Sequence, residues 1–479
     1  MASYQYSKFS KKQPTSISLV SWVNNSNLIM GTYQEQSESK EPNSKGCKKR
    51  KKASVLLRKR IRMCSNGGTE PDLISNLPAS IIENIMGCLP LRDAVRTSIL
   101  SREWRYKWVT CPELVFDFWF DQMFLGNHKL EKLVYPILKL HQGPLIKFAL
   151  QVPAFRSCPD IDQWIDLMSN NTIQDFTLHI SRGDNHKLPS RIFTFHQLRK
   201  LKLYKCVFNP PLGFKGFNKI LNLNLQNVDL VPETFANFIS ACPMLERLRM
   251  VDCTSFDCLE IDAPKLKFLE FHGVFRSISF KNSLLLAEVF ISFSSMDFKM
   301  GKCFSFNLIK SLSCLPSLEE LHLQAFALEK LAEDSLPKKL PVTLKTLKIL
   351  HLSDMYFEKI EEISCALCLI RSSPNLQKLK VTAFTFDVVD SVGEYLREQK
   401  SSDCLLAQLK TVDMLLFSGV EPEMEFVKYL LASATGLEEM AILPHAGSVS
   451  DGGESILNEL KQFPRASPKA EIINVKKDS

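Results

Sequence analysis

Two kinds of side chain cluster in this sequence in ways that could carry chemistry: thiols and basic groups. Cys365 and Cys368 have the C-x-x-C spacing of metal and redox sites, but they lie in an apolar, helix-patterned stretch without a second cysteine pair or a nearby histidine. We therefore interpret them as buried structural thiols. The chain has no glycine-rich phosphate loop and no HExxH, GxSxG or protein-kinase motif. These observations predict a non-catalytic protein without a metal or cofactor.

The basic side chains concentrate near the N-terminus. Residues 1–62 hold 14 Lys or Arg and 3 Asp or Glu, whereas the remainder holds 46 and 49, so the body gives no global reason to expect nucleic-acid binding. Two basic groups separated by five residues have the spacing of a bipartite nuclear import signal. A solvated charged tail is the alternative, and an organelle transit peptide is a third interpretation. The two groups are Lys48, Lys49, Arg50, Lys51 and Lys52, and Arg58, Lys59 and Arg60.

Composition also indicates the cellular compartment in which the protein is expected. Residues 1–69 are rich in Ser, Asn, Gln and Lys without sustained periodicity, which predicts a disordered extension, and Met63 is an alternative start. The sequence has no apolar run of about 18 residues and no secretory h-region. The 14 cysteines are scattered through a long chain, which is typical of reduced thiols. We expect the nucleus, the cytoplasm or both, with no membrane partner.

Compact helices are predicted after Asp72. Pro78 suits a first helical turn and Pro90 ends the same helix, because proline lacks the N–H that a helix interior needs. Its apolar stripe comprises Ile81, Ile82, Ile85, Met86 and Leu89. A second short helix is expected near residues 94–99, and Ser101 is placed to cap a third that carries Trp104 and Trp108 at i, i+4. So small a bundle predicts that part of its apolar surface is covered by another domain or a partner.

Residues 73–78 (Leu-Ile-Ser-Asn-Leu-Pro) and the run from Leu89 to Arg105 closely resemble the F-box of plant F-box proteins, without gaps. The resemblance implies docking on a Skp-family adaptor and, through it, on a cullin. A purely structural core is the alternative for the same residues. The positions carried over from the family motif are Leu77, Pro78, Ile81, Ile85, Leu89, Pro90, Val95, Ser98, Trp104 and Trp108.

A cassette of the form L-x-x-L-x-L, with other apolar residues allowed, recurs after this region at spacings of 20 to 33 residues, which overlaps the range of leucine-rich repeats. Prolines precede several cassettes, so each unit is predicted to be a strand plus a helix. Stacked units form an open αβ solenoid of the α/β class, with the strands on the concave side. The cassettes begin at Leu145, Ile173, Leu198, Ile220, Leu245, Leu266, Leu286, Leu318, Leu344, Leu376, Leu409 and Leu437.

The C-terminal part, from Leu409 through Phe417 to Met440, resembles the FBD module of plant F-box/FBD/leucine-rich-repeat proteins. Physically it is predicted to be one more strand-helix-strand unit that closes the solenoid. The expected domains are a disordered extension at 1–69, an F-box at 70–116, the solenoid at 117–400 and the FBD-like unit at 401–475.

The residue between the two apolar positions of each strand is expected to point outward, because side chains alternate along a strand. These residues form one predicted row, called the outward row, whose mixed charges suit a polypeptide partner. Ordinary solvated surface is the alternative for each member. The row comprises Lys202, Asn224, Arg249, Glu270, Phe290, His322, Lys348, Lys380 and Asp413.

Taken with the resemblance, these features predict the substrate-recognition subunit of a Skp-cullin-F-box ubiquitin ligase, which binds an unknown protein substrate. Two other classes remain open. One is a receptor whose solenoid holds a small molecule, and the other is a nuclear scaffold that works through residues 45–62 without a ligase.

Overall fold

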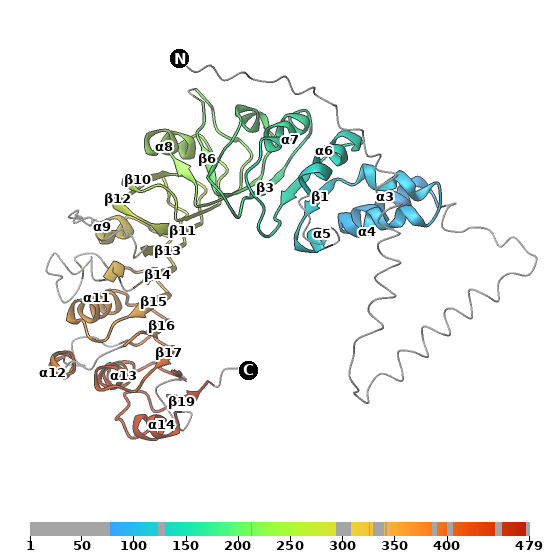
Figure 1. Cartoon of the computed structure of the whole chain (residues 1–479). Helices are drawn as coiled ribbons and strands as arrows, with labels where there is room; N and C mark the ends of the chain where they lie inside the picture. Colours follow the sequence, from blue (N-terminus) through green and yellow to red (C-terminus); the bar gives the residue numbers. More distant parts are fainter. Residues whose placement is uncertain are drawn as a thin grey trace, which may run out of the picture. The chain divides into compact units, whose positions relative to one another are not determined.

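The computed structural model describes residues 77–122, 130–211, 213–293, 308–324, 326–328, 340, 343–385, 390–399, 406–445 and 453–475. The predicted extension and its basic groups lie outside these residues. The described residues form two compact units, one built from residues 77–112 and 130–143 and the other from 113–122 and 144–475 (Figure 1). Across the described part of the chain, we find no helix that is both long and apolar enough to cross a membrane.

The first unit is a small helical bundle. It contains α3 (Ala79–Cys88), α4 (Leu91–Arg96), the 3-10 helices η1 (Thr97–Ile99) and η2 (Trp104–Thr110), and α6 (Leu130–Leu140). Pro78 stands at the N-cap of α3 and that helix ends before Pro90, as the sequence predicts. Pro90 is also the N-cap of α4, which begins at Leu91 rather than near residue 94. The predicted cap at Ser101 is wrong, because its hydroxyl donates to the Glu103 carboxylate at 2.8 Å and η2 begins after Glu103 without a side-chain cap.

The stretch around α6 belongs to the first unit, whereas the sequence placed the solenoid from residue 117 onward. Two hydrogen bonds hold the end of this stretch to η2. The Gln142 N–H donates to the carbonyl of Val109 at 2.8 Å, and His141 Nε2 lies 2.9 Å from the carbonyl oxygen of Cys111. The chain therefore passes from the first unit to the second at residue 113, returns to the first around α6, and enters the second again at residue 144.

The second unit is built on one parallel sheet of 14 strands. Helices α8, α9, α11 and α13 lie along one side of it in Figure 1, and the strands line the other side. This arrangement confirms the predicted αβ repeat fold. The strands are β1 (Glu113–Phe116), β2 (Lys147–Leu150), β3 (Asp175–His179), β5 (Lys200–Tyr204), β7 (Asn222–Gln226), β9 (Arg247–Val251), β11 (Phe268–Gly273), β13 (Glu288–Phe293), β14 (Glu320–Gln324), β15 (Ile349–Met355), β16 (Lys378–Ala383), β17 (Thr411–Phe417), β18 (Glu439–Pro444) and β19 (Glu471–Asn474).

The outer layer is less regular than the prediction of one helix per unit. Where cassettes follow one another after 21 and 20 residues, at Leu245, Leu266 and Leu286, strands β10 (Phe256–Asp262) and β12 (Phe275–Lys281) replace the helix and pair in parallel. So short a connection leaves no room for a helix of several turns and two loops. The other outer elements are α5 (Phe118–Gln122), α7 (Asp160–Met168), α8 (Pro232–Ser240), α9 (Leu308–Ser313), α11 (Ile360–Arg371), α12 (Asp390–Glu398), α13 (Glu421–Ser433), α14 (Glu454–Leu460), η3 (Ser190–Thr194), β4 (His186–Lys187), β6 (Cys206–Phe208) and β8 (Asp229–Leu230).

The core lies between the two layers and is filled by the cassette positions. In eleven of the twelve predicted L-x-x-L-x-L cassettes, the second and third apolar residues are buried. The exception is the cassette assigned to Leu344. Leu347, Leu350 and Leu352 are each 0% exposed, so the cassette of β15 begins at Leu347, three residues later. The prediction was wrong because Leu344, Leu347 and Ile349 also fit the L-x-x-L-x-L pattern.

Candidate functional site

The first unit divides the ten predicted adaptor-binding residues into a surface set and a core set. Pro78, Ile81 and Pro90 are exposed, with Ile81 at 44%, and Leu77, Ile85 and Leu89 are half-buried. Sequence reasoning missed three further exposed residues, Ile99 at 62%, Leu100 at 55% and Tyr106 at 50%. The signal was available for Ile99 and Leu100, since both lie inside the run that resembles an F-box. The first unit therefore exposes several large apolar side chains, and exposed apolar side chains of this kind are typical of an interaction surface.

The other four predicted residues are inside the bundle. Trp104 and Trp108 are 2% and 1% exposed, and Val95 is 6% exposed. The Ser98 hydroxyl donates to the carbonyl of Arg105 at 2.9 Å, which ties η1 to η2. These four residues are buried in the bundle and pack its interior, as the structural alternative expects of them.

On the second unit, eight of the nine predicted residues of the outward row lie side by side on neighbouring strands. The pairing runs without a break from Lys202 on β5 to Asp413 on β17. The exception is Lys348, which precedes β15 and donates to Glu319 at 2.8 Å. His351 occupies the row position on β15. The row also extends to Thr177 on β3, which occupies the same middle position in the cassette at Ile173 and could have been found from it.

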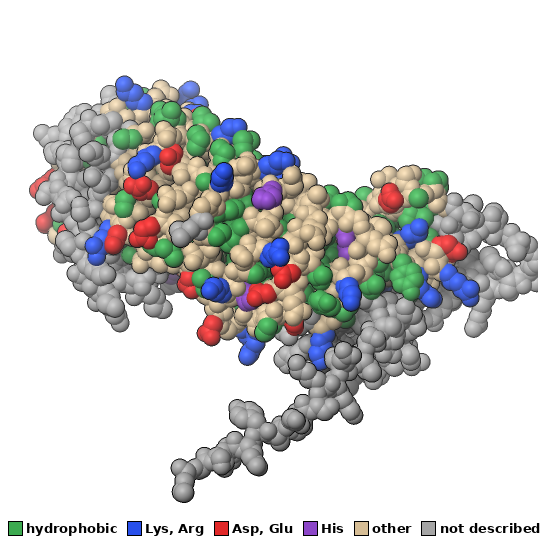
Figure 2. All heavy atoms as spheres, turned by 90° about the horizontal axis from the view of Figure 1, so that it is seen from above, with side chains coloured by type: hydrophobic (Ala, Val, Ile, Leu, Met, Phe, Trp, Pro, Cys, Tyr) green, Lys and Arg blue, Asp and Glu red, His purple; other side chains and the backbone are tan. Residues whose placement is uncertain are grey.

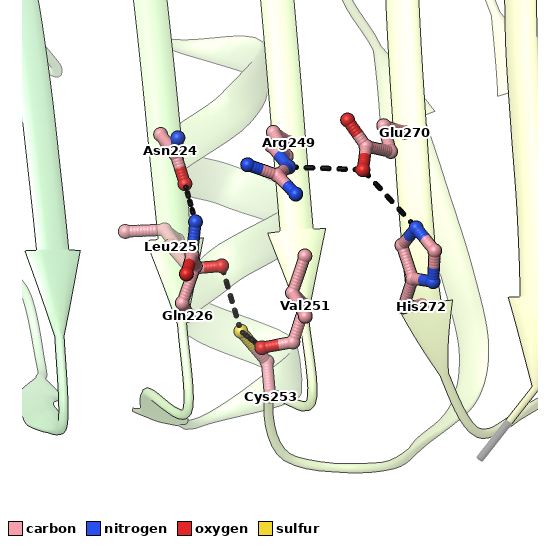
Figure 3. Close-up of polar contacts among 8 residues, drawn as sticks. All are labelled: Asn224, Leu225, Gln226, Arg249, Val251, Cys253, Glu270 and His272. Carbon is pink, nitrogen blue, oxygen red and sulfur yellow. Dashed lines mark hydrogen bonds and ion pairs between the residues drawn. The ribbon is translucent and has the colours of Figure 1, made fainter. Parts of the chain in front are cut away.

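The middle of the row carries a polar network that links the neighbouring strands β9 and β11 (Figure 3). Arg249 Nε lies 2.9 Å from Glu270 Oε1, and His272 Nε2 lies 3.1 Å from the same oxygen. The hydrogen bond from His272 and the positive charge of Arg249 lower the pKa of Glu270. Arg249 and Glu270 largely neutralise each other, so this segment offers fixed hydrogen-bonding groups rather than a net charge.

The neighbouring segment of the row is aromatic. The rings of His322 and His351 stack with their centroids 3.9 Å apart, and Phe290 meets His322 edge-on at 5.3 Å. Burial lowers the pKa of His322 and lowers that of His351 to about 3. Both imidazoles are therefore neutral at physiological pH. Lys380, the next residue of the row, follows this uncharged stretch.

At β3, β5 and β7 the same face is hollowed. This hollow, called the β5 hollow, has a volume of about 220 Å³ and also reaches Gln151 after β2. Among the described residues that line it none is acidic, and Lys202 is its one basic residue. The polar groups from the three strands are Thr177, His179, Lys202, Tyr204, Asn224 and Gln226.

The thiols of the Cys365 and Cys368 pair are buried. Burial raises the pKa of Cys365 well above its usual value of 9.0 and also raises that of Cys368, so neither is a thiolate at neutral pH. Cys253, drawn in Figure 3, donates to the carbonyls of Leu225 and Val251 at 3.5 and 3.6 Å. Within the described ranges, no three His, Cys, Asp or Glu side chains converge as they would around a metal ion.

The charges on the surface are mixed. Figure 2 shows one face of the molecule, on which basic and acidic side chains are interspersed among hydrophobic ones. An interspersed pattern of this kind suits recognition of a particular polypeptide rather than of a uniformly charged polymer.

Three family models match the chain: the F-box domain at residues 74–115, the LRR repeats of the FBD-associated F-box protein At5g56370 at 161–381, and FBD at 398–442. The F-box/FBD/LRR-repeat protein At1g13570 of Arabidopsis thaliana is 36% identical over 419 residues, which cover 85% of this chain and 99% of that protein. The F-box/FBD/LRR-repeat protein At3g26920 of the same plant is 25% identical over 449 residues, with coverages of 87% and 100%.

Among solved structures, the Leptospira interrogans LRR protein LIC12759 is 14% identical, with a TM-score of 0.30 and coverages of 82% and 98%. The family assignment comes instead from the sequence matches, which extend over both described units and over nearly the whole length of the first relative. The chain carries the three parts that this relative's name lists, with the F-box first, the leucine-rich repeats next and the FBD last, and it belongs to the F-box/FBD/LRR-repeat family.

Proposed function

We propose that this chain is the substrate-recognition subunit of a Skp-cullin-F-box E3 ubiquitin ligase. The F-box docks on the Skp-family adaptor, the adaptor joins the chain to a cullin, and the outward row binds a protein substrate. F-box domains generally dock on Skp-type adaptors, and F-box/LRR proteins are generally non-catalytic adaptors themselves.

The observation that carries the proposal is the exposed apolar surface of the F-box. Its tryptophans are buried, yet Ile81, Ile99 and Leu100 stay 44%, 62% and 55% exposed. A monomeric unit gains nothing from large apolar side chains in water, whereas burying the exposed half of each against a partner contributes about 1 kcal/mol. The surface is thus suited to a protein partner.

The mechanism that follows needs no catalytic residue in this chain. A substrate held on the solenoid stays near a ubiquitin-charged enzyme carried by the cullin, and its lysines react at a raised effective concentration. The outward row contributes the selective part, since its charges, amides and rings differ from strand to strand.

The experiment is a binding measurement between the full-length chain and a purified Skp-family adaptor. In the test variant Leu77→Ala and Pro78→Ala are combined, and we expect adaptor affinity to fall at least about tenfold because apolar contact area is lost. The matched control combines Leu284→Ala and Leu285→Ala, two apolar residues that are 62% and 49% exposed on the second unit. The control should bind the adaptor as the wild type does.

Either of two results would count against the proposal. If the wild-type chain does not bind the adaptor, the F-box has only a structural role. If the test variant and the control lose affinity equally, the loss does not come from the proposed docking face.

We also propose a nuclear as well as a cytoplasmic location. Support for it comes from the two basic groups at residues 48–52 and 58–60, whose spacing suits a bipartite import signal.

A further inference from the structure

We infer that the β5 hollow binds an acidic group of the substrate, a carboxylate or a phosphate carried on an extended peptide, with Lys202 as its counter-charge. The inference rests on the proposed function, because it assigns a subsite to the face on which the substrate is proposed to bind.

Charge is the first argument. Lys202 is exposed and makes no ion pair with any residue in the described ranges. Two cations elsewhere on this face are neutralised by acidic partners, Arg249 by Glu270 at 2.9 Å and Lys378 by Asp413 at 2.8 Å. A hollow that contains a cation and no acid leaves the positive charge for a ligand, and its complement is an anion.

Hydrogen-bond donors are the second argument. Gln226 Nε2 donates to Asn224 Oδ1 at 3.1 Å, as Figure 3 shows, which occupies the acceptor of Asn224 and leaves its amide nitrogen as a donor. Asn224 and Lys202 face each other directly across β7 and β5. An oxyanion accepts several hydrogen bonds at once, so an amide beside an ammonium group fits it better than a single lysine would.

The wall of the hollow is fixed by a stacked pair. The rings of His179 and Tyr204 lie 4.2 Å apart at an angle of 23°. Burial lowers the pKa of His179, so this ring adds no positive charge at neutral pH. Lys202 therefore supplies the positive charge of the lining alone, and a change at this one position should remove the preference for an anion.

The test uses the full-length chain and synthetic peptide libraries with one fixed central residue, either Asp, Glu, phosphoserine, Asn or Lys, flanked by randomised positions. We expect the wild type to retain an acidic library at least about fivefold over the Asn library. Lys202→Met should abolish the preference, Lys202→Glu should shift it to the Lys library, and Lys202→Arg should keep it. Comparison of Asp and Glu with phosphoserine identifies which anion is preferred.

The matched control is Lys187→Met, which removes an exposed lysine on β4 of the outer layer that has no ion pair with a described residue and lies outside both the hollow and the outward row. It should leave the acidic preference intact. A wild-type chain with no acidic preference overturns the inference, and so does an equal loss in Lys187→Met, because the effect would then come from the overall charge of the protein. Adaptor binding is measured on the same preparations as a separate test of the proposed function. If the chain binds the adaptor but shows no acidic preference, only the subsite is disproved.

Discussion

Replacing Glu423 tests whether a buried carboxylate holds the turn that leads into α13. The residue is 0% exposed and lies in the first turn of that helix. Its Oε2 accepts the N–H groups of Ser418 at 2.8 Å and Gly419 at 2.9 Å, and its Oε1 accepts the Thr385 hydroxyl at 2.6 Å. One side chain thus fixes both the turn and its contact with the preceding repeat.

Glu423→Ala should open this turn. The change leaves two backbone donors without their acceptor, while the Thr385 hydroxyl can rotate toward another. A buried donor left unsatisfied costs about 1–3 kcal/mol. Ser418 and Gly419 are half-buried, so the lower value applies and the two together cost about 2 kcal/mol. Hydrogen exchange of this turn should therefore become about 30-fold faster.

Glu423→Gln separates the hydrogen bonds from the charge. Burial raises the pKa of Glu423 above its usual value of 4.5, so the folded chain disfavours the carboxylate form. The contribution of Glu423 to stability consequently falls as pH rises from 4.5 through the folded pKa, and stays low above it. Glutamine keeps an acceptor for the two N–H groups and carries no charge, so at neutral pH the turn should exchange no faster than in the wild type.

Hydrogen exchange followed by mass spectrometry on peptides covering residues 415–425 measures these changes, with peptides from β9 as the internal reference. If the alanine variant exchanges within threefold of the wild type, the two backbone N–H groups do not depend on Glu423 as their acceptor. If the glutamine and alanine variants exchange equally fast, an uncharged acceptor at this position is not enough to hold the turn.

Three further predictions concern pH, the first unit and import. Burial lowers the pKa of His351 to about 3, so between pH 6.5 and about pH 3 the unfolded chain binds a proton at this ring that the folded chain does not. The urea concentration at the unfolding midpoint should therefore decrease as the pH is lowered from 6.5 to 5, and an equal decrease in His351→Phe would contradict this. Trp108→Ala removes a side chain that is 1% exposed and should cost about 3–5 kcal/mol, which limited proteolysis of the first unit would detect; unchanged cleavage would contradict it. Alanine at Lys48–Lys52 should move a fluorescent fusion of the full chain from nucleus to cytoplasm, whereas Lys11→Ala with Lys12→Ala should not.

Sequence patterns predicted the inner sheet well because burial there follows a strict alternation. Leu201 and Leu203 on β5, and Leu248 and Met250 on β9, are all at most 2% exposed, and each pair brackets an outward residue. A frame error arises only where two frames are equally apolar, as with Leu344 and Leu347.

The outer layer and the F-box surface were harder to predict for physical reasons. The segment that connects two inner strands can form a helix or a strand, and only the short spacing of the cassettes indicates that β10 and β12 are strands. In the F-box, Trp108 and Ile99 are both apolar, yet one is 1% and the other 62% exposed. Composition does not distinguish a buried position from an exposed one when both lie on short 3-10 helices. The β5 hollow likewise depends on the register of three strands, which the sequence alone leaves open.

The turn after several strands follows one conformational rule. Lys205, Asn227 and Asp252 directly follow β5, β7 and β9 with φ of 55°, 49° and 48°. Each donates its N–H to the next strand, Asp252 to the carbonyl of His272 at 2.8 Å. This left-handed step lets the chain leave the sheet at the same point in these three repeats, so the outer layer can vary there while the outward row stays in register.

Asp252 offers a test of this rule, because it is exposed and its side chain is not needed for packing. Asp252→Val should destabilise the chain by about 1–2 kcal/mol, since a β-branched residue is strained at positive φ, and Asp252→Gly should not destabilise it. Asp257→Val is the control: this residue is in β10, its side chain is 87% exposed, and valine suits a strand. Urea unfolding of the three variants measures the difference. If Asp252→Val and Asp257→Val have the same midpoint, the left-handed turn does not constrain the repeat, and the regular spacing of the outward row must have another cause.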